Sequence, residues 1–231
     1  MSDPLSGRGA GQTRHASIGG RTVRGPGRRR VARIGRVAAV KHWQWIAWGA
    51  IAAPLLAALV RLAEPVVQAN PPEALQHLTG RAAFWLLVAT LTIRPLQRAG
   101  LRGVMTARRT LGLGAFFWAT IHLLLVLVFD YAPDFSTLGS DLVSQIHLSL
   151  GLGAWLLMLP LALTSNQRAM RRLGRRWGRL HKLVWPVLLL AWAHLYAKER
   201  VATTLLWSAS LAVLLLIASR LDSKRRSRAP L

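Results

Sequence analysis

Six long apolar blocks constrain the fold of this 231-residue chain more than any other feature. Each is close to the roughly 20 residues with which an α-helix crosses about 30 Å of hydrocarbon. Soluble helices are seldom so long and so uniformly apolar, and apolar residues make up 52% of the chain. The sequence therefore predicts an all-α, polytopic membrane protein with a six-helix bundle over 42–219. The blocks cover about 43–60, 82–97, 111–129, 142–163, 182–197 and 203–219.

Charge is distributed unevenly around these blocks. Two basic tails, 1–41 and 220–231, share one side of the predicted membrane with 94–109 and 165–182, and these segments hold 27 of the 31 Lys and Arg residues. Basic loops stay in the cytoplasm, so both termini are predicted to be cytoplasmic. The net charge of +23 then reports topology and contact with membrane lipid, and we expect no nucleic-acid binding. The tail 1–41, rich in Gly, Ser and Arg, is predicted to be disordered.

Missing residue types narrow the chemistry. The chain has no Cys, which excludes iron–sulfur clusters, thiolate zinc sites and cysteine nucleophiles. It also has neither a GxGxxG strand–helix motif nor a Walker A loop, so an enzyme of this form takes its reducing power from elsewhere. Acidic residues are absent from the middle of all six blocks, which argues against proton pumps and cation-coupled transporters. Histidine is the remaining functional residue type inside the predicted membrane.

Two histidines are predicted to lie at the same depth. His122 is 12 residues into the third block and His194 is 13 residues into the fifth, or about 18 and 20 Å from the cytoplasmic side. Histidines on two helices at one depth can provide both axial ligands of a b-type haem. The alternative is that each histidine only joins helices through a hydrogen bond, as in a non-redox scaffold.

Two further histidines have less certain partners. His147 begins the fourth block near the outer surface, where it is a substitute ligand or a hydrogen-bond donor to a haem propionate. His181 lies at the inner edge, about 20 Å below His194. Thirteen residues place these two on different faces of a straight helix, so either Pro186 kinks the helix or His181 sits at its mouth. No histidine faces His181 from the third block, which counts against a second bis-histidine haem.

Small and basic residues extend the candidate site. Gly112 and Gly114 in the third block, and Gly151 and Gly153 in the fourth, allow a helix or a flat ring to approach closely. On the predicted inner face, arginines cluster in two loops and suit a flavin phosphate or an acidic donor. They are Arg108, Arg109, Arg175 and Arg176.

Four stretches resemble the MsrQ family, the haem-binding membrane subunits of the bacterial periplasmic protein-methionine-sulfoxide reductase system, within the ferric-reductase-like transmembrane group. The patterns RRTLGL…H and W-x-x-L-H-x12-H carry the resemblance, which covers about 40–219, while the tail 1–41 departs from it. The stretches are LTGRAAFWLLVATLTIRPLQR (78–98), ARRTLGLGAFFWATIHLLLVLVFD (107–130), LPLALTSNQRAMRRLGRRWGRLHKLVW (159–185) and AHLYA (193–197).

The resemblance implies a location, cofactors and partners. It implies a protein of the bacterial inner membrane that binds haem b through iron ligands at His122 and His194, with His181 serving an inner cofactor, either a second haem or flavin mononucleotide (FMN). It also implies electron transfer from a quinol or a cytoplasmic flavin reductase to a periplasmic, molybdopterin-containing methionine-sulfoxide reductase subunit, which repairs oxidised proteins. The sulfoxide chemistry then belongs to that partner. A stand-alone ferric, metal or quinone reductase is the alternative within the same chemistry.

Overall fold

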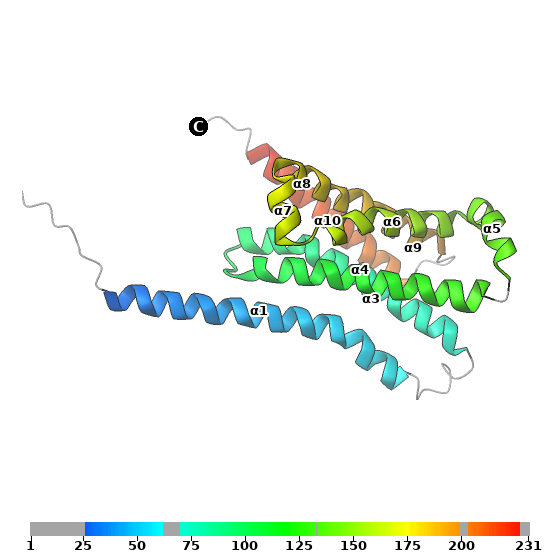
Figure 1. Cartoon of the computed structure of the whole chain (residues 1–231), viewed down its shortest axis with the longest axis horizontal. Coiled ribbons are helices and arrows are strands. Elements are labelled where there is room, and N and C mark those ends of the chain that lie inside the picture. The colour runs from blue at the N-terminus through cyan, green and yellow to red at the C-terminus, as the bar shows by residue number, and fades with distance from the viewer. Residues whose placement is uncertain (1–25, 62–69, 133, 199–202, 227–231) are drawn as a thin grey trace, which may run out of the picture. The chain divides into compact units, whose positions relative to one another are not determined.

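The computed structural model describes residues 26–61, 70–132, 134–198 and 203–226, and these residues form helices and turns without any strand. The expected all-α class is confirmed (Figure 1). The long helices are α1 (Pro26–Arg61), α3 (Pro71–Arg98), α4 (Ala107–Val126), α6 (Ile146–Leu163), α9 (Val184–Lys198) and α10 (Thr204–Arg226). The short α-helices are α5 (Leu138–Ser144), α7 (Gln167–Leu173) and α8 (Arg175–Leu180). The remaining turns are the 3₁₀ segments η1 (Val104–Thr106), η3 (Phe135–Thr137) and η4 (His181–Leu183), and the π-helical turn η2 (Leu127–Tyr131).

Five segments are long and apolar enough to cross a membrane, and they match the first, third, fourth, fifth and sixth predicted blocks. The chain is therefore a multi-pass membrane protein. The segments are His42–Val60, Val104–Tyr131, Ile146–Leu163, Arg175–Lys198 and Thr204–Asp222.

The second predicted block, 82–97, lies within α3, whose apolar stretch is bounded by Arg81 and Arg94. These charges lower its mean hydropathy, yet α3 has nine buried residues and packs against α4, α9 and α10. A helix enclosed by neighbours needs less apolar surface than one that faces lipid. Its two buried threonines bond within the helix: the Thr79 hydroxyl donates to the Leu75 carbonyl and that of Thr90 to the Leu86 carbonyl, both at 2.8 Å.

Local sequence sets the ends of α3 and the turn after it. The side chain of Asn70 accepts a hydrogen bond from the Glu73 amide, and prolines follow it in the first turn, where no intrahelical amide bond is lost. After Arg98, Gly100 and Gly103 adopt φ angles of +97° and +82°, which other residues rarely adopt. This short turn makes α3 and α4 antiparallel neighbours.

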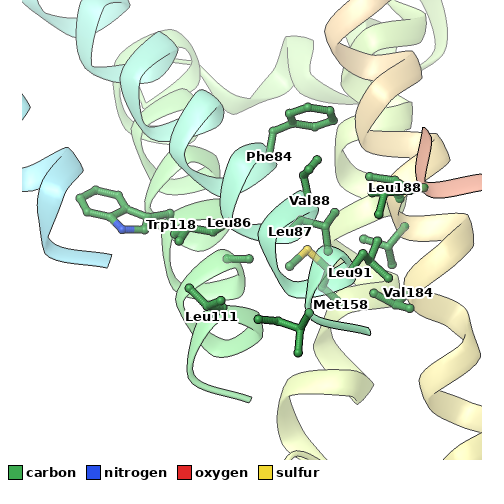
Figure 2. Packing of buried hydrophobic residues seen from close by; sticks show 14 of the residues in the cluster. Phe84, Leu86, Leu87, Val88, Leu91, Leu111, Trp118, Met158, Val184 and Leu188 are labelled. Atoms are coloured by element: carbon green, nitrogen blue, oxygen red, sulfur yellow. The ribbon is translucent and has the colours of Figure 1, made fainter. Parts of the chain in front are cut away.

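The bundle is built from two helix pairs. The most extensive helix packing is between α3 and α4 and between α6 and α9, with α4 against α6 joining the pairs. In Figure 1, α5 lies at one end of these helices, and α7 and α8 lie at the other. Between the pairs, Leu87 and Leu91 of α3 meet Met158 of α6 and Leu188 of α9 in the buried core (Figure 2).

The structure differs from expectation at the first tail. The chain divides between Gly35 and Arg36, and α1 already begins at Pro26, so 26–41 is helical rather than disordered. Proline suits the first turn of a helix, and the Val, Ala, Arg and Lys residues after it are compatible with helix. Residues 1–25 lie outside the described part of the chain. At the other end, α10 continues to Arg226, into the predicted basic tail 220–231.

Two predicted spans are interrupted near their first residues. The fourth block divides at Gln145, whose ψ of 93° is extended, so α5 ends at Ser144 and α6 begins at Ile146. The fifth begins with the η4 turn, and α9 follows from Val184. Pro186 therefore stands in the first turn of α9, where it starts the helix instead of kinking it.

The outer part of α1 docks on α4 through one hydrogen bond and one glycine. The Trp118 indole donates to the Ile51 carbonyl at 2.9 Å. A β-carbon on Gly114 would lie 2.4 Å from Cγ1 of Ile51, so the close approach needs glycine.

We predict that Gly114→Ala separates α1 from α4 and destabilises the fold by about 1–3 kcal/mol, as overpacking does. Gly112→Ala is the matched control two residues away, because its β-carbon would meet Thr90 at an ordinary 3.5 Å. Thermal unfolding in detergent measures both. Equal melting temperatures for the two variants would contradict the docking role of Gly114.

Candidate cofactor site

A cavity of about 390 Å³ lies between the two helix pairs, enclosed by α3, α4, α6 and α9. Its inner end is closed by Phe84, Leu87 and Met158, which also belong to the buried core. Its outer end is polar and includes Asp130 and Lys198. An enclosed apolar chamber with a few polar groups at one end is typical of a cofactor site.

The predicted pair, His122 on α4 and His194 on α9, lines this cavity. Their ring centroids are 6.1 Å apart and the ring planes cross at 78°. Both side chains are largely enclosed by the helices around them. The fold thus brings together two imidazoles that are 72 residues apart in the sequence.

One nitrogen of each ring is held by a backbone carbonyl. Nδ1 of His122 lies 2.9 Å from the Gln76 carbonyl oxygen of α3, and Nδ1 of His194 lies 2.6 Å from the His147 carbonyl oxygen of α6. A carbonyl only accepts, so Nδ1 carries the proton in both rings. Nε2 is then the unprotonated nitrogen of each neutral ring and is available to a metal.

The spacing of the pair suits one metal ion between the rings. Imidazole binds metals such as zinc at about 2.0–2.1 Å, which puts the centroids of two opposed rings about 6 Å apart. Within the described residues, no group of three or more His, Asp or Glu side chains is arranged to hold a metal. The pair therefore fits an ion whose other ligands belong to a flat macrocycle, as in haem.

His147 lies beside this pair. It is the second residue of α6, its ring centroid is 6.1 Å from that of His194, and it lines the outer part of the cavity. Its backbone already supports His194. The position suits an auxiliary role at the mouth of the cavity.

His181 is not part of the cavity. It lies in η4, before α9, where its ring stacks on that of Trp177 with centroids 4.0 Å apart. Its Nδ1 bonds to the Trp177 carbonyl at 3.3 Å, and its Nε2 is buried without a hydrogen-bond partner in the described structure. The structure thus places His181 at a helix mouth, one of the two arrangements considered from the sequence.

The four predicted arginines lie at the end of the bundle that carries α8. Arg108 and Arg109 are in the first turn of α4, and Arg175 and Arg176 are in the first turn of α8. Arg108 is half-buried and close enough to His181 to act on it electrostatically, whereas the other three are exposed. Only Arg108 therefore joins His181 in one local group.

Sequence reasoning missed two residues of the site. The Gln76 carbonyl and Gly80, both on α3, contact the His122 ring. The signal that could have found them is a repeat, because Gln76 and Gly80 precede His147 and Gly151 by the same 71 residues.

Hydrogen bonds also tie the outer rim of the cavity together. The Gln76 amide donates to Asp130 at 3.0 Å, joining α3 to η2, and the Tyr131 hydroxyl donates to Asp141 of α5 at 3.0 Å. The Ser149 hydroxyl donates to the Leu142 carbonyl, so α5 is also joined to α6. These bonds hold α5 over the rim.

A helical membrane bundle with facing imidazoles is typical of transmembrane cytochromes, and the comparisons with known proteins agree with this class. Residues 79–192 match the model of the ferric reductase like transmembrane component family. The matched region contains Gly80, His122, His147 and Gly151 and ends two residues before His194.

Relatives define the family more narrowly. A protein of Xanthomonas axonopodis pv. citri (strain 306) is 40% identical over 171 residues, which are 70% of this chain and 78% of the relative. Proteins of Pectobacterium carotovorum subsp. carotovorum (strain PC1) and Cronobacter sakazakii (strain ATCC BAA-894) are 42% and 43% identical over 143 residues, 61% of this chain and 72% of each relative. All three are named protein-methionine-sulfoxide reductase heme-binding subunit MsrQ. The chain belongs to the MsrQ family.

Proposed function

We propose that this protein is a membrane cytochrome b that carries electrons to a methionine-sulfoxide reductase subunit. The single observation that carries the proposal is the facing pair His122 and His194 inside an enclosed cavity. The names of the relatives, which are heme-binding subunits of such a reductase, support both the cofactor and the partner.

The histidines are the proposed axial ligands of one haem b. When bound, the haem supplies a metal centre that gains and loses one electron. The Gln76 and His147 carbonyls hold the Nδ1 protons, so each ring keeps one orientation and offers Nε2 to the iron. Apolar walls around the cavity exclude water.

The outer rim is the proposed site of the haem propionates. Lys198 and Arg81 line the cavity there, and they are two of only four Lys or Arg residues on the predicted outer side. A cation that is retained at a membrane-facing cavity is expected to pair with an anion. His147 is a further donor to a propionate.

The opposite end is the proposed entry point for electrons. His181, Arg108 and the exposed arginines of α8 lie there, and guanidinium groups suit a flavin phosphate. We infer that this end holds FMN or a second haem beside His181 and receives electrons from a quinol or a cytoplasmic flavin reductase.

The orientation follows from charge. The end that carries α7 and α8 holds most of the described Lys and Arg residues, and Asp130, Asp134 and Asp141 lie at the end that carries α5. Under the positive-inside rule the α8 end faces the cytoplasm. This supports a bacterial inner-membrane protein with cytoplasmic termini and a periplasmic, molybdopterin-containing partner at the α5 end. Two electrons and two protons convert one methionine sulfoxide to methionine and water, so two electrons cross the membrane for each side chain repaired.

Removing either ligand should abolish haem binding. We predict that His122→Ala and His194→Ala each lower the haem content per chain at least tenfold while the protein still inserts, because one imidazole alone leaves the iron without its second ligand. His42→Ala, an exposed position on α1, is the control. The measurement is a reduced-minus-oxidised absorption spectrum with haem quantified.

Two results of this experiment would overturn the assignment. Full haem in both ligand variants would mean that other residues bind it. A colourless wild-type protein, expressed with ample haem, would mean that the histidines only join helices in a non-redox scaffold.

The acceptor can be identified from reoxidation. We predict that the reduced protein is reoxidised rapidly only when the molybdopterin subunit and methionine sulfoxide are both present, with one sulfoxide consumed for every two electrons. Stopped-flow spectroscopy measures the rate. Equally fast reoxidation by a ferric chelate or a quinone without that subunit would instead favour a stand-alone reductase.

Charge reversal tests the inner end. Arg175→Glu with Arg176→Glu should weaken FMN binding about tenfold, or slow electron entry by the same factor, because phosphate recognition loses two cations. Arg171→Glu with Arg172→Glu on α7 is the control with an equal change of charge at exposed positions. If flavin content and reduction rate are unchanged in the Arg175 and Arg176 variant, α8 has no role in the inner site.

A further inference from the structure

The two helix pairs hold their histidines in the same way. In each pair the second helix carries the histidine, and the first helix carries the carbonyl that accepts from its Nδ1. The first helices, α3 and α6, run from the α5 end to the α8 end, and the second helices, α4 and α9, run back. The site is thus built from two similar half-sites.

A glycine follows each accepting carbonyl by four residues. Gly80 follows Gln76 on α3, and Gly151 follows His147 on α6. In an α-helix the amide of residue i+4 bonds to the carbonyl of residue i, so each carbonyl serves both its own helix and a histidine. A side chain at i+4 would stand above that carbonyl and obstruct the second donor.

The space above both glycines is taken by the imidazoles. A β-carbon on Gly151 would lie 2.8 Å from Nδ1 and 3.0 Å from Cε1 of His194. A β-carbon on Gly80 would lie 3.2 Å from both Nδ1 and Cε1 of His122. Alanine therefore requires the His194 ring to move, and requires a smaller adjustment of the His122 ring.

Other helical glycines of the bundle do different work. A β-carbon on Gly153 would meet only Leu190, at 3.8 Å, and one on Gly112 would meet Thr90 at 3.5 Å. Neither contact is with a histidine. The contact with an imidazole is therefore a property of Gly80 and Gly151 in particular, and the small-residue packing of membrane helices does not account for it.

We propose that Gly80 and Gly151 are positioning residues, each of which lets one histidine ring lie on the opposite helix so that Nδ1 bonds to the carbonyl four residues earlier and Nε2 is directed to the cofactor. The proposal rests on the proposed haem site. It also makes the site an internal repeat, because 71 residues separate Gln76 from His147 and Gly80 from Gly151, and 72 separate His122 from His194.

The test begins with Gly151→Ala and its control Gly153→Ala on the same helix. We expect Gly151→Ala to weaken haem binding about tenfold or more, the usual cost of losing a group that orients a ligand. The haem that remains should have a higher midpoint potential and altered low-spin EPR g-values, because the imidazole loses the bond that raises its basicity. Gly153→Ala should match the wild type. A Gly151→Ala protein with unchanged haem affinity, potential and EPR spectrum would overturn the proposal.

Gly80→Ala, with Gly112→Ala as its control, keeps the test decisive if Gly151→Ala fails to fold. We expect the same changes in a milder form, because the β-carbon of residue 80 would be 0.4 Å further from Nδ1 of its histidine than that of residue 151 (3.2 against 2.8 Å). Equal spectra, potentials and affinities for Gly80→Ala and Gly112→Ala would again overturn the proposal.

A measurement without haem separates this inference from the function. In the apo protein labelled with ¹⁵N-histidine, the Nδ1 proton of His194, assigned by comparison with His194→Ala, should give a hydrogen-bonded NMR signal that is lost in Gly151→Ala and kept in Gly153→Ala. A wild-type protein that binds no haem would refute the proposed function, and this signal would still decide the role of the glycine. Retention of the signal in Gly151→Ala would refute that role.

Discussion

The hydrogen bond from a histidine Nδ1 to a helix carbonyl is the interaction on which the rest of the site depends. A polar ring inside hydrocarbon needs a partner, and a helix carbonyl that accepts twice provides one without adding another polar side chain. The bond also decides which nitrogen remains free. The depth of His122 and His194, the absence of side chains at Gly80 and Gly151, and the packing of α3 on α4 and of α6 on α9 all serve this geometry.

The cavity exists because each histidine lies on its own helix pair. The outer helices and α10 cover the pairs, and Leu87, Leu91 and Met158 close the space between them at the inner end. The core thus keeps the two rings at a fixed separation. A site between rigid helices holds its ligands more accurately than one on loops, which suits an electron carrier that works without large movements.

The two ends of the bundle differ in chemistry as well as in charge. At the α5 end, the cavity rim is tied together by Gln76, Asp130 and Tyr131. At the α8 end, the stacked Trp177 and His181 rings lie near Arg108. His181 and His194 belong to different elements, η4 and α9, so the two ends can hold cofactors in independent orientations. This separation suits the transfer of electrons from one face of the membrane to the other.

The sequence by itself determined the all-α membrane class, five of the spans by composition, and the shared depth of His122 and His194, because apolar length and helical rise are local properties. The interior helix α3 was predicted as a span, although its burial depends on neighbours that composition does not reveal. Only the tertiary structure decided that the rings face each other across one cavity, that His181 lies outside it, and that the Gln76 carbonyl and Gly80 complete the site. Those facts depend on the rotation of each helix about its axis and on backbone groups, and residue types do not encode either one directly.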